Sequence, residues 1–230
     1  MEKLRLFIKL TRPLFLLGPA IGYAMGVGIA YYLGFEINWQ AYLLGQAWVT
    51  LMQLSTQYLN EYFNAPADLL NDNRTYLSGG SGAIGPGKLT RRTAQAAALT
   101  CLAFLASLTV LIISRLDPAP AVYLVLGLGF LGGFFYSTPP LRLEASGYGE
   151  LTASVLVTLL VPMLGYILQT GEMHRLVAMA AFPSFAAHLA MLLALELPDY
   201  TNDIKYEKHN LMVRLGWQVG MQLHNVLILV

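Results

Sequence analysis

Long apolar stretches alternate with short polar ones along the chain. Six of these stretches contain no Asp, Glu, Lys or Arg, and they cover residues 13–33, 39–59, 94–114, 119–136, 151–168 and 176–195. A hydrocarbon core of about 30 Å requires roughly 20 apolar residues per helix, so each stretch is long enough to cross a membrane. Because the apolarity is continuous rather than alternating over short segments, the pattern favours helices over a β-barrel.

A seventh apolar stretch begins at Trp217 and reaches the last residue, Val230, before it attains spanning length. We therefore expect residues 1–230 to form one all-α, polytopic transmembrane domain that is truncated at its C-terminus. The alternative is a final segment that only dips into the bilayer. Glycines that recur every four residues predict close packing between helices; these are Gly18, Gly22 and Gly26, and Gly129 and Gly133.

Composition supports a membrane protein, since 56% of the residues are hydrophobic and only 12% are charged. With six crossings, twelve of the fourteen Lys and Arg residues fall on one side, and only Arg115 and Arg175 fall on the other. This bias predicts an integral protein of the cell inner membrane whose larger loops are cytoplasmic. The lipid bilayer is the expected surrounding, and no nucleic-acid partner is expected. The single cysteine, Cys101, excludes an intramolecular disulfide, and the four histidines lack metal-ligand spacing.

A polar cluster follows the second apolar stretch, in the sequence NEYFNAPAD at residues 60–68. Asn60, Asn64 and Asp68 recur every four residues, so a continuing helix presents them on one side over about 12 Å. Pro66 removes a backbone donor, so the helix either continues with a kink or ends before Asp68. Two glutamines extend the stripe back into the membrane segment, Gln53 and Gln57. Amide side chains at that depth in the membrane are costly when they face lipid, so we expect both glutamines to face the bundle interior.

A second cluster follows the sixth stretch, in ELPDYTND at residues 196–203, where Asp199 and Asp203 are again four apart. Four crossings separate the two clusters, so both emerge on the same side. Mg²⁺ is commonly held by one or two carboxylates together with phosphate oxygens of a substrate. The clusters therefore predict a Mg²⁺ and diphosphate site above an apolar cavity. The expected counter-charges for the diphosphate are Arg74, Lys88, Arg142 and Lys205.

These motifs resemble those of the UbiA superfamily of intramembrane prenyltransferases. Its two acidic motifs, Asn-Asp-x-x-Asp-x-x-x-Asp and Asp-x-x-x-Asp, correspond to Asn60, Glu61, Asn64 and Asp68, and to Asp199 and Asp203. Further matches are Arg12-Pro13, Asn73-Arg74-Thr75, YSTPPLRL at 136–143 and VRLG at 213–216, so the resemblance spans nearly the whole chain. The stretch SGGSGAI at 78–84 and the form of the second motif are most similar to members that prenylate 1,4-dihydroxy-2-naphthoate in menaquinone synthesis.

The resemblance implies about nine transmembrane helices around a central cavity, of which six to seven are present here. It also implies Mg²⁺-dependent transfer of a prenyl group from a polyprenyl diphosphate to an aromatic acceptor. The expected metal ligands are Asn60, Glu61, Asn64, Asp68, Asp199 and Asp203, of which Asn60, Asp68, Asp199 and Asp203 are the expected catalytic residues. Tyr62 and Tyr136 are expected either to contact the prenyl group and its allylic cation or to belong to the interfacial aromatic belt.

Three departures from the family pattern affect this prediction. Glu61 stands where aspartate is usual, and Asn64 replaces a carboxylate with a neutral amide, which should weaken Mg²⁺ binding. Asp72 continues the spacing and is a candidate to compensate. Leu195 stands where many relatives carry a polar or basic residue.

Other interpretations remain open. GAIGPGK at 82–88 resembles a phosphate-binding P-loop, but Leu89 occupies the Ser/Thr position and no strand precedes it. A glycine-rich loop that caps the site, with Lys88 near the phosphates, and a solvated linker are the better alternatives. A transporter or channel would need polar groups through its whole depth, whereas here they concentrate at one face. A relative that binds isoprenoid without turnover is the third alternative.

Overall fold

Each predicted apolar stretch forms a helix in the computed structural model, which describes residues 1–71 and 73–230. The long helices are α2 (Leu14–Tyr32), α3 (Trp39–Asp68), α4 (Arg91–Leu116), α5 (Pro120–Phe134) and α8 (Arg175–Glu196). A sixth continuous helix combines α6 (Gly149–Val155), the π-helical turn η2 (Leu156–Leu160) and α7 (Val161–Thr170). The predicted all-α fold class is thereby confirmed.

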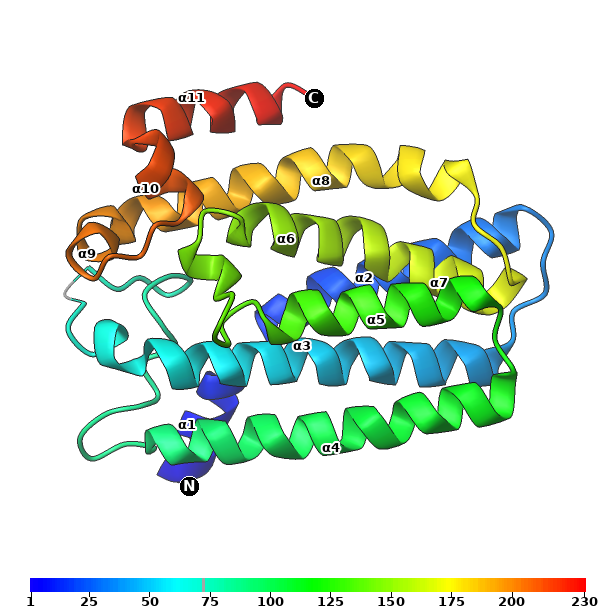
Figure 1. Ribbon diagram of the computed structural model, residues 1–230, viewed down its shortest axis with the longest axis horizontal. Helices are drawn as coiled ribbons and strands as arrows, with labels where there is room; N and C mark the ends of the chain where they lie inside the picture. The colour runs from blue at the N-terminus through cyan, green and yellow to red at the C-terminus, as the bar shows by residue number, and fades with distance from the viewer. Residues whose placement is uncertain (72) are drawn as a thin grey trace.

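Shorter helices lie outside the apolar stretches or at their ends. They are α1 (Glu2–Thr11), η1 (Leu143–Ala145), η3 (Leu197–Asp199), α9 (Tyr200–Lys205), α10 (Leu211–Leu215) and α11 (Trp217–Ile228). The last of these, α11, is the incomplete seventh apolar stretch, and it packs along α8 (Figure 1). The helix α1 was not predicted, because it precedes the first apolar stretch.

Among the described residues, four helical segments are long and apolar enough to cross a membrane: Leu14–Tyr32, Arg91–Leu116, Gly149–Thr170 and Arg175–Lys205. The helix α5 is apolar but shorter. Although α3 has 30 residues, glutamines along it lower its hydropathy. The chain is an integral membrane protein, and Gln53 and Gln57 of α3 line a cavity within the bundle.

Two of the predicted glycine contacts show how closely the helices approach. A Cβ at Gly26 in α2 would lie 1.9 Å from the backbone oxygen of Pro162 in α7, and a Cβ at Gly133 would lie 2.5 Å from a side-chain carbon of Met52 in α3. No larger residue fits at Gly26 without moving the backbone of α7. The small-residue spacing therefore joins α2 to α7 and α5 to α3, as predicted.

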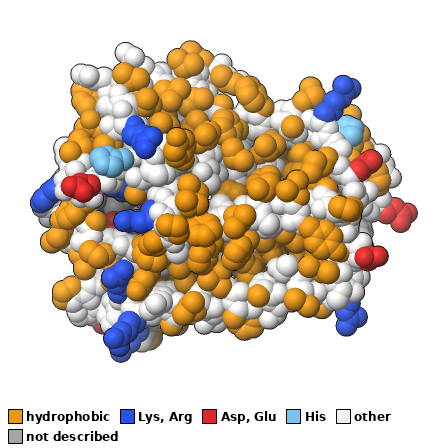
Figure 2. Space-filling model, viewed as in Figure 1, with side chains coloured by type: hydrophobic (Ala, Val, Ile, Leu, Met, Phe, Trp, Pro, Cys, Tyr) orange, Lys and Arg blue, Asp and Glu red, His pale blue; other side chains and the backbone are white. Residues whose placement is uncertain are grey.

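The two ends of the bundle differ in the length of their connections (Figure 1). One end holds the long segment between α3 and α4, the turn before α6 and the helices α9 and α10; the other holds the short turns after α2, α4 and α7. We call the first the loop end. On the face seen in Figure 2, an apolar belt crosses the middle of the molecule, and most Lys and Arg side chains gather at the loop end.

The helix α3 continues through Pro66 to Asp68, which settles the alternative left open by the sequence. Because Pro66 has no N–H, the backbone oxygen of Tyr62 loses its helical donor. The Nε of Arg91 at the start of α4 donates to that oxygen at 2.6 Å. The proline is accommodated by a side chain from the neighbouring helix, and the polar stripe therefore stays on a helical surface.

Candidate active site

A polar cavity of about 170 Å³ lies at the loop end of the bundle. The stripe on α3 contributes Asn60, Asn64 and Asp68 to its wall, and the segment after α8 contributes Asp199 and Asp203. The three α3 residues face one way because their spacing of four matches the helical repeat. Both predicted motifs thus border the same cavity.

A carboxylate that no motif had indicated, Glu144, lies at the centre of the first motif. Its Oε2 accepts hydrogen bonds from the Nδ2 atoms of both Asn60 and Asn64, the latter at 2.8 Å. The Glu144 side chain is 4% exposed, and its Oε1 has no partner among the described residues. Burial raises the pKa of this carboxyl above its ordinary range. The side chain at position 64 is a neutral amide, and the carboxylate of Glu144, which is distant in the sequence, lies directly against it.

The second acidic motif lies in contact with the segment that contains the glycine-rich loop. Asn71, just after α3, donates from Nδ2 to Asp199 Oδ1 at 2.7 Å. A Cβ at Gly80 would lie 2.4 Å from Asp68 Oδ2, and one at Gly79 would lie 3.1 Å from Asp199 Oδ1. Both glycines have φ between +73° and +79°, a conformation that favours glycine. The bare backbone of this loop therefore passes directly against two carboxylates of the site.

The same loop is anchored in the bundle and is not a solvated linker. Ala83, Ile84 and Leu89 are buried and pack with Leu59 and Ala94 of the neighbouring helices. Of the two alternatives drawn from the sequence, the structure supports a loop that caps the site.

The Glu61 side chain forms hydrogen bonds within the protein and does not contribute to the wall of the polar cavity. Its Oε1 accepts from Arg12 Nη2 at 2.7 Å and from the backbone N–H of Ser81 at 2.6 Å, while its Oε2 accepts from Ser81 Oγ at 2.6 Å. Only 3% of Glu61 is exposed. Both of its oxygens therefore hold Arg12 and the glycine-rich loop, and Glu61, expected as a metal ligand, is not among the described residues that line the polar cavity.

Two of the basic residues expected at the diphosphate hold the loop instead. Arg74 donates from Nε to the backbone oxygen of Gly79 at 2.8 Å and from Nη2 to that of Asp68 at 2.7 Å. Lys88 donates from Nζ to the backbone oxygen of Gly82 at 3.0 Å. Neither is among the described residues that line the polar cavity, so their predicted contact with the diphosphate is not seen in this arrangement.

The cations that line the polar cavity are Arg12, Arg142 and Lys208. Arg142 was predicted. No role at the site was predicted for Lys208, whereas Lys205, expected at the site, is exposed, with its Nζ 5.7 Å from the ring centre of Tyr206. Lys208 lines the cavity and Lys205 does not, because α9 ends at Lys205 and the chain then turns through Glu207, whose φ is +54°. The turn brings Lys208 Nζ to 3.9 Å from Asp203 Oδ1.

The charges around this cavity are unequal. Among the described residues, five carboxylates line it together with three cations, and these carboxylates are Asp68, Glu144, Asp199, Asp203 and Glu207. Burial, and next the negative charge of Glu61, raises the pKa of Asp68 to about 7. Burial lowers the pKa of Lys208, but the surrounding carboxylates, Asp203 foremost, outweigh burial and raise it above its ordinary value. Such an excess of carboxylates over cations is suited to an added cation.

The donor set fits a metal held jointly with a ligand. In the described part of the chain, no three His, Cys, Asp or Glu side chains converge into a preformed metal cage. Hard oxygen atoms nevertheless surround the cavity, including the unpartnered Oε1 of Glu144. This is the arrangement expected for Mg²⁺, which keeps few protein ligands and takes phosphate oxygens. Asp72, the candidate compensating carboxylate, lies outside the described residues.

The two tyrosines lie in different places. Tyr62 stacks beneath Arg91, whose guanidinium carbon is 4.0 Å from the ring centre, and packs edge-on against Phe63. It is not among the described lining residues of either cavity, so its position favours the alternative of an interfacial residue over a prenyl contact. Tyr136 lines both cavities, as predicted.

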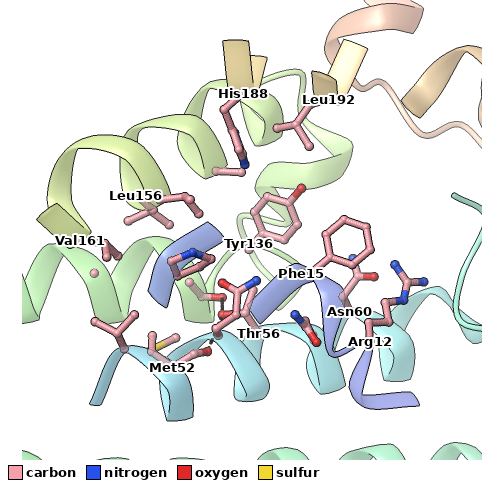
Figure 3. A pocket seen from close by; sticks show the side chains of 18 of the residues that line it. Arg12, Phe15, Met52, Thr56, Asn60, Tyr136, Leu156, Val161, His188 and Leu192 are labelled. Carbon is pink, nitrogen blue, oxygen red and sulfur yellow. Dashed lines mark hydrogen bonds between the residues drawn. The ribbon is translucent and has the colours of Figure 1, made fainter. Parts of the chain in front are cut away.

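A second, largely apolar cavity of about 280 Å³ continues from the polar one into the bundle. Its wall includes Phe15 of α2, Met52 of α3, Leu156 of η2 and Leu192 of α8 (Figure 3). Four residues border both cavities: Arg12, Asn60, Tyr136 and Asp199. A ligand with a charged head and an apolar tail would match this junction of a polar chamber with an apolar one.

Comparison with known proteins decides the family. The family model described as the UbiA prenyltransferase family matches residues 21–230. The chain belongs to the UbiA prenyltransferase family. A search of curated proteins found no match.

Solved structures of UbiA proteins share the fold. A UbiA homolog from Archaeoglobus fulgidus bound to DMAPP and Mg²⁺ has a TM-score of 0.71 at 19% identity, with 96% of this chain and 73% of that chain covered. The same homolog bound to GPP and Mg²⁺ gives the same values. A structure described as digeranylgeranylglyceryl phosphate synthase has a TM-score of 0.67 at 18% identity, with 99% and 74% covered. These likenesses confirm the UbiA-type helix bundle.

Proposed function

We propose that this protein transfers a prenyl group from a prenyl diphosphate to an aromatic acceptor. The observation that carries the proposal is the junction of the two cavities, where a chamber lined by carboxylates and cations opens into an apolar one. Family membership supports the transferase activity, and the two ligand-bound states of the UbiA homolog from Archaeoglobus fulgidus support this class of donor.

The diphosphate of the donor binds in the polar cavity. Lys208 and Arg142 contact its oxygens, and Arg12, held by Glu61, stands at the mouth of the apolar cavity. Fixed cations at this position stabilise the negative charge that accumulates on the leaving group as the allylic C–O bond breaks. The capping loop excludes water and so protects the allylic cation from hydrolysis.

Magnesium is the proposed cofactor. Asp68, Asp199 and Asp203 would hold it, and Asn60, Asn64 and Glu144 line the same cavity. When bound, Mg²⁺ acts as a Lewis acid that polarises the diphosphate oxygens. In this arrangement Glu61 fixes Arg12 and the loop, while Arg74 and Lys88 keep the loop in place over the carboxylates.

The prenyl chain lies in the apolar cavity. Tyr136, at the junction, presents its ring to the carbon that becomes cationic, a contact that contributes roughly 0.5 to 2 kcal/mol. The electron-rich acceptor ring then attacks that carbon. We further propose 1,4-dihydroxy-2-naphthoate as the acceptor, which places the reaction in menaquinone biosynthesis with the loop end on the cytoplasmic side of the cell inner membrane. The resemblance of the 78–84 stretch supports this choice.

One assay tests the proposal. Membranes that contain the protein are supplied with prenyl diphosphates of ten carbons and longer and with a panel of aromatic acceptors, and products are measured by mass spectrometry with and without a chelator. We expect a prenylated aromatic product that disappears on chelation and returns with Mg²⁺. Binding of the donor without any product would support the non-catalytic alternative, and product formation that resists chelation would contradict the metal role.

A further inference from the structure

The apolar cavity contains an imidazole that neither acidic motif accounts for. His188 comes from α8 and points into the cavity, where Leu156 and Leu192 lie on the surrounding wall (Figure 3). Its Nδ1 lies 3.0 Å from the Oγ of Ser154, which is fully buried in α6. A polar ring surrounded by apolar side chains costs free energy unless both of its nitrogens find partners. Only one of the two nitrogens has a partner here among the described residues.

The contact with Ser154 fixes the orientation of the ring. When one imidazole nitrogen is engaged, that hydrogen bond determines the tautomer and leaves the other nitrogen available. With Nδ1 bound to Ser154, Nε2 is the nitrogen left available at the wall of the cavity. It offers one hydrogen bond, as donor or acceptor according to the tautomer, to a molecule that occupies this space.

A second orphaned polar group lines the same cavity. Gln57 of α3 lies one turn before the first motif, and neither its Nε2 nor its Oε1 has a hydrogen-bond partner in the described part of the chain. Both atoms are nonetheless buried. A prenyl chain has no polar atom to satisfy either Gln57 or His188, so a hydrocarbon tail alone does not explain these groups.

We propose that His188 and Gln57 form the binding site for the oxygen substituents of the aromatic acceptor. His188 is the anchoring residue, and Ser154 positions it. This inference rests on the proposed function, because it assigns the acceptor of that reaction to one part of the apolar cavity. The ligand class is an aromatic ring that bears hydroxyl, carbonyl or carboxylate oxygens, stacked among apolar side chains and held by neutral hydrogen bonds.

The test measures acceptor binding separately from donor binding. The probes are 1,4-dihydroxy-2-naphthoate, its 1,4-dimethyl ether, and geranyl thiolodiphosphate, a donor analogue that ionises poorly. His188→Asn keeps a side-chain nitrogen near Ser154 but removes the one left available at the wall of the cavity, whereas His188→Gln places an amide near the position of Nε2. His224→Gln is the matched control, since the Nδ1 of His224 is bonded to the backbone oxygen of Ala190 at 2.8 Å and its side chain does not line the cavity.

We expect His188→Asn to weaken binding of the free dihydroxy acceptor roughly threefold to tenfold, as for the loss of one hydrogen bond. Methylation of the two acceptor hydroxyls should weaken binding to the wild type by a similar factor. The same methylation should hardly weaken binding to His188→Asn any further. His188→Gln should recover most of the affinity, Ser154→Ala should lose part of it, and His224→Gln should match the wild type. The Kd of geranyl thiolodiphosphate should stay unchanged in every variant.

Equal acceptor affinity in His188→Asn and His224→Gln would overturn the inference. A loss that affects the donor analogue as strongly as the acceptor would also overturn it, because that result indicates a role in packing α6 against α8. If the wild type binds the acceptor with this dependence on His188 but forms no prenylated product, the acceptor site stands and the proposed transfer fails.

Discussion

The polar side chains at the two ends of the bundle have different tasks. At the end opposite the loops, Asn38 caps α3 by accepting from the N–H of Ala41 at 3.0 Å, and Gln169 accepts from the N–H of Asn38 at 2.7 Å. These groups complete the backbone hydrogen bonding of helix ends. At the loop end, by contrast, Glu144, Glu150 and Glu196 each keep a buried oxygen without a partner among the described residues.

This difference between the polar side chains of the two ends indicates that the functional site lies at the loop end. Buried carboxylate oxygens without partners destabilise a fold, so a protein that retains several at one end gains something else from them. At the loop end, the same region holds bare glycine backbone against Asp68 and Asp199. The contacts of Asn38 and Gln169 at the opposite end are explained by folding alone, whereas the unpartnered oxygen of Glu144 at the loop end lies in the cavity proposed to bind a cation and phosphate oxygens.

The largest effect on the transfer rate is expected when a carboxylate of the site is replaced, compared with a carboxylate at the opposite end of the bundle. Asp199→Asn should lower the transfer rate roughly a hundredfold to a thousandfold, since it removes a carboxylate proposed to hold the Mg²⁺ that stabilises charge on the leaving group. Asp117→Asn is the matched control, because Asp117 is exposed at the end of α4 and its φ of +42° suits asparagine as well. Product formation by mass spectrometry measures both. Equal rates in the two variants would contradict the assignment of the loop end.

The next effect distinguishes two lysines of the same segment. Lys208→Met should reduce the transfer rate roughly tenfold to a hundredfold, as expected for the loss of a charge-assisted contact with the diphosphate. Lys205→Met should change it little, because Lys205 is exposed and is not among the described residues that line the cavity. Steady-state rates at saturating acceptor, with the donor varied, provide the measurement. A larger loss in Lys205→Met would restore the role first expected from the sequence.

A smaller effect compares two glycines of the capping loop. Alanine at Gly80 or at Gly87 introduces a side chain at a φ of +79° or +72°, so both variants bear a similar backbone penalty of about 1 to 2 kcal/mol. Only at Gly80 does the new Cβ meet a functional group, Asp68 Oδ2, while nothing lies within 4 Å of one at Gly87.

We therefore expect Gly80→Ala to lower the transfer rate severalfold to about tenfold relative to Gly87→Ala, since small displacements of a catalytic group are costly. Thermal unfolding of the two purified variants should give similar midpoints. If their rates were also alike, the loop would act only as a connection between α3 and α4.

The smallest effect lies at the opposite end and concerns stability alone. Asn38→Ala removes the cap of α3 and should cost about 1 kcal/mol, seen as a lower Tm. The transfer rate below the unfolding transition should match that of the wild type, because Asn38 lies at the far end of α3 from the acidic cluster. A specific loss of rate without a change in Tm would show that the two ends are coupled.

Much of the fold was accessible from the sequence because the membrane imposes long apolar segments. The apolar stretches predicted the long helices, and the glycine spacing predicted close packing at Gly26, although its partner, α7, was known only from the structure. The path of α3 beyond Pro66 was not decided, since it depends on Arg91, a donor from another helix. The π-helical turn η2 has no pattern of its own in the sequence.

The site was predicted where spacing within one helix determines geometry, as for Asn60, Asn64 and Asp68. Two residues of the site, Glu144 and Lys208, were missed because turns of the chain bring them to the cavity. Glu144 directly follows the YSTPPLRL stretch, and its position after that family match was the one available signal. Lys208 was overlooked because a basic residue at a membrane face is normally an anchor, and only the turn after α9 directs it inward.

One binding measurement tests most directly whether the polar and apolar cavities are two halves of one site. The affinities of inorganic diphosphate and of geranyl thiolodiphosphate are measured in Mg²⁺ for the wild type, Asp199→Asn and Ala153→Leu, with Ala106→Leu as control. Ala153 lines the apolar cavity, and Ala106 is exposed on α4. We predict that Asp199→Asn weakens both ligands by a similar factor, that Ala153→Leu weakens only the prenylated one, and that chelation abolishes both. Prenyl-ligand binding that is unaffected by Ala153→Leu and by chelation would contradict the account.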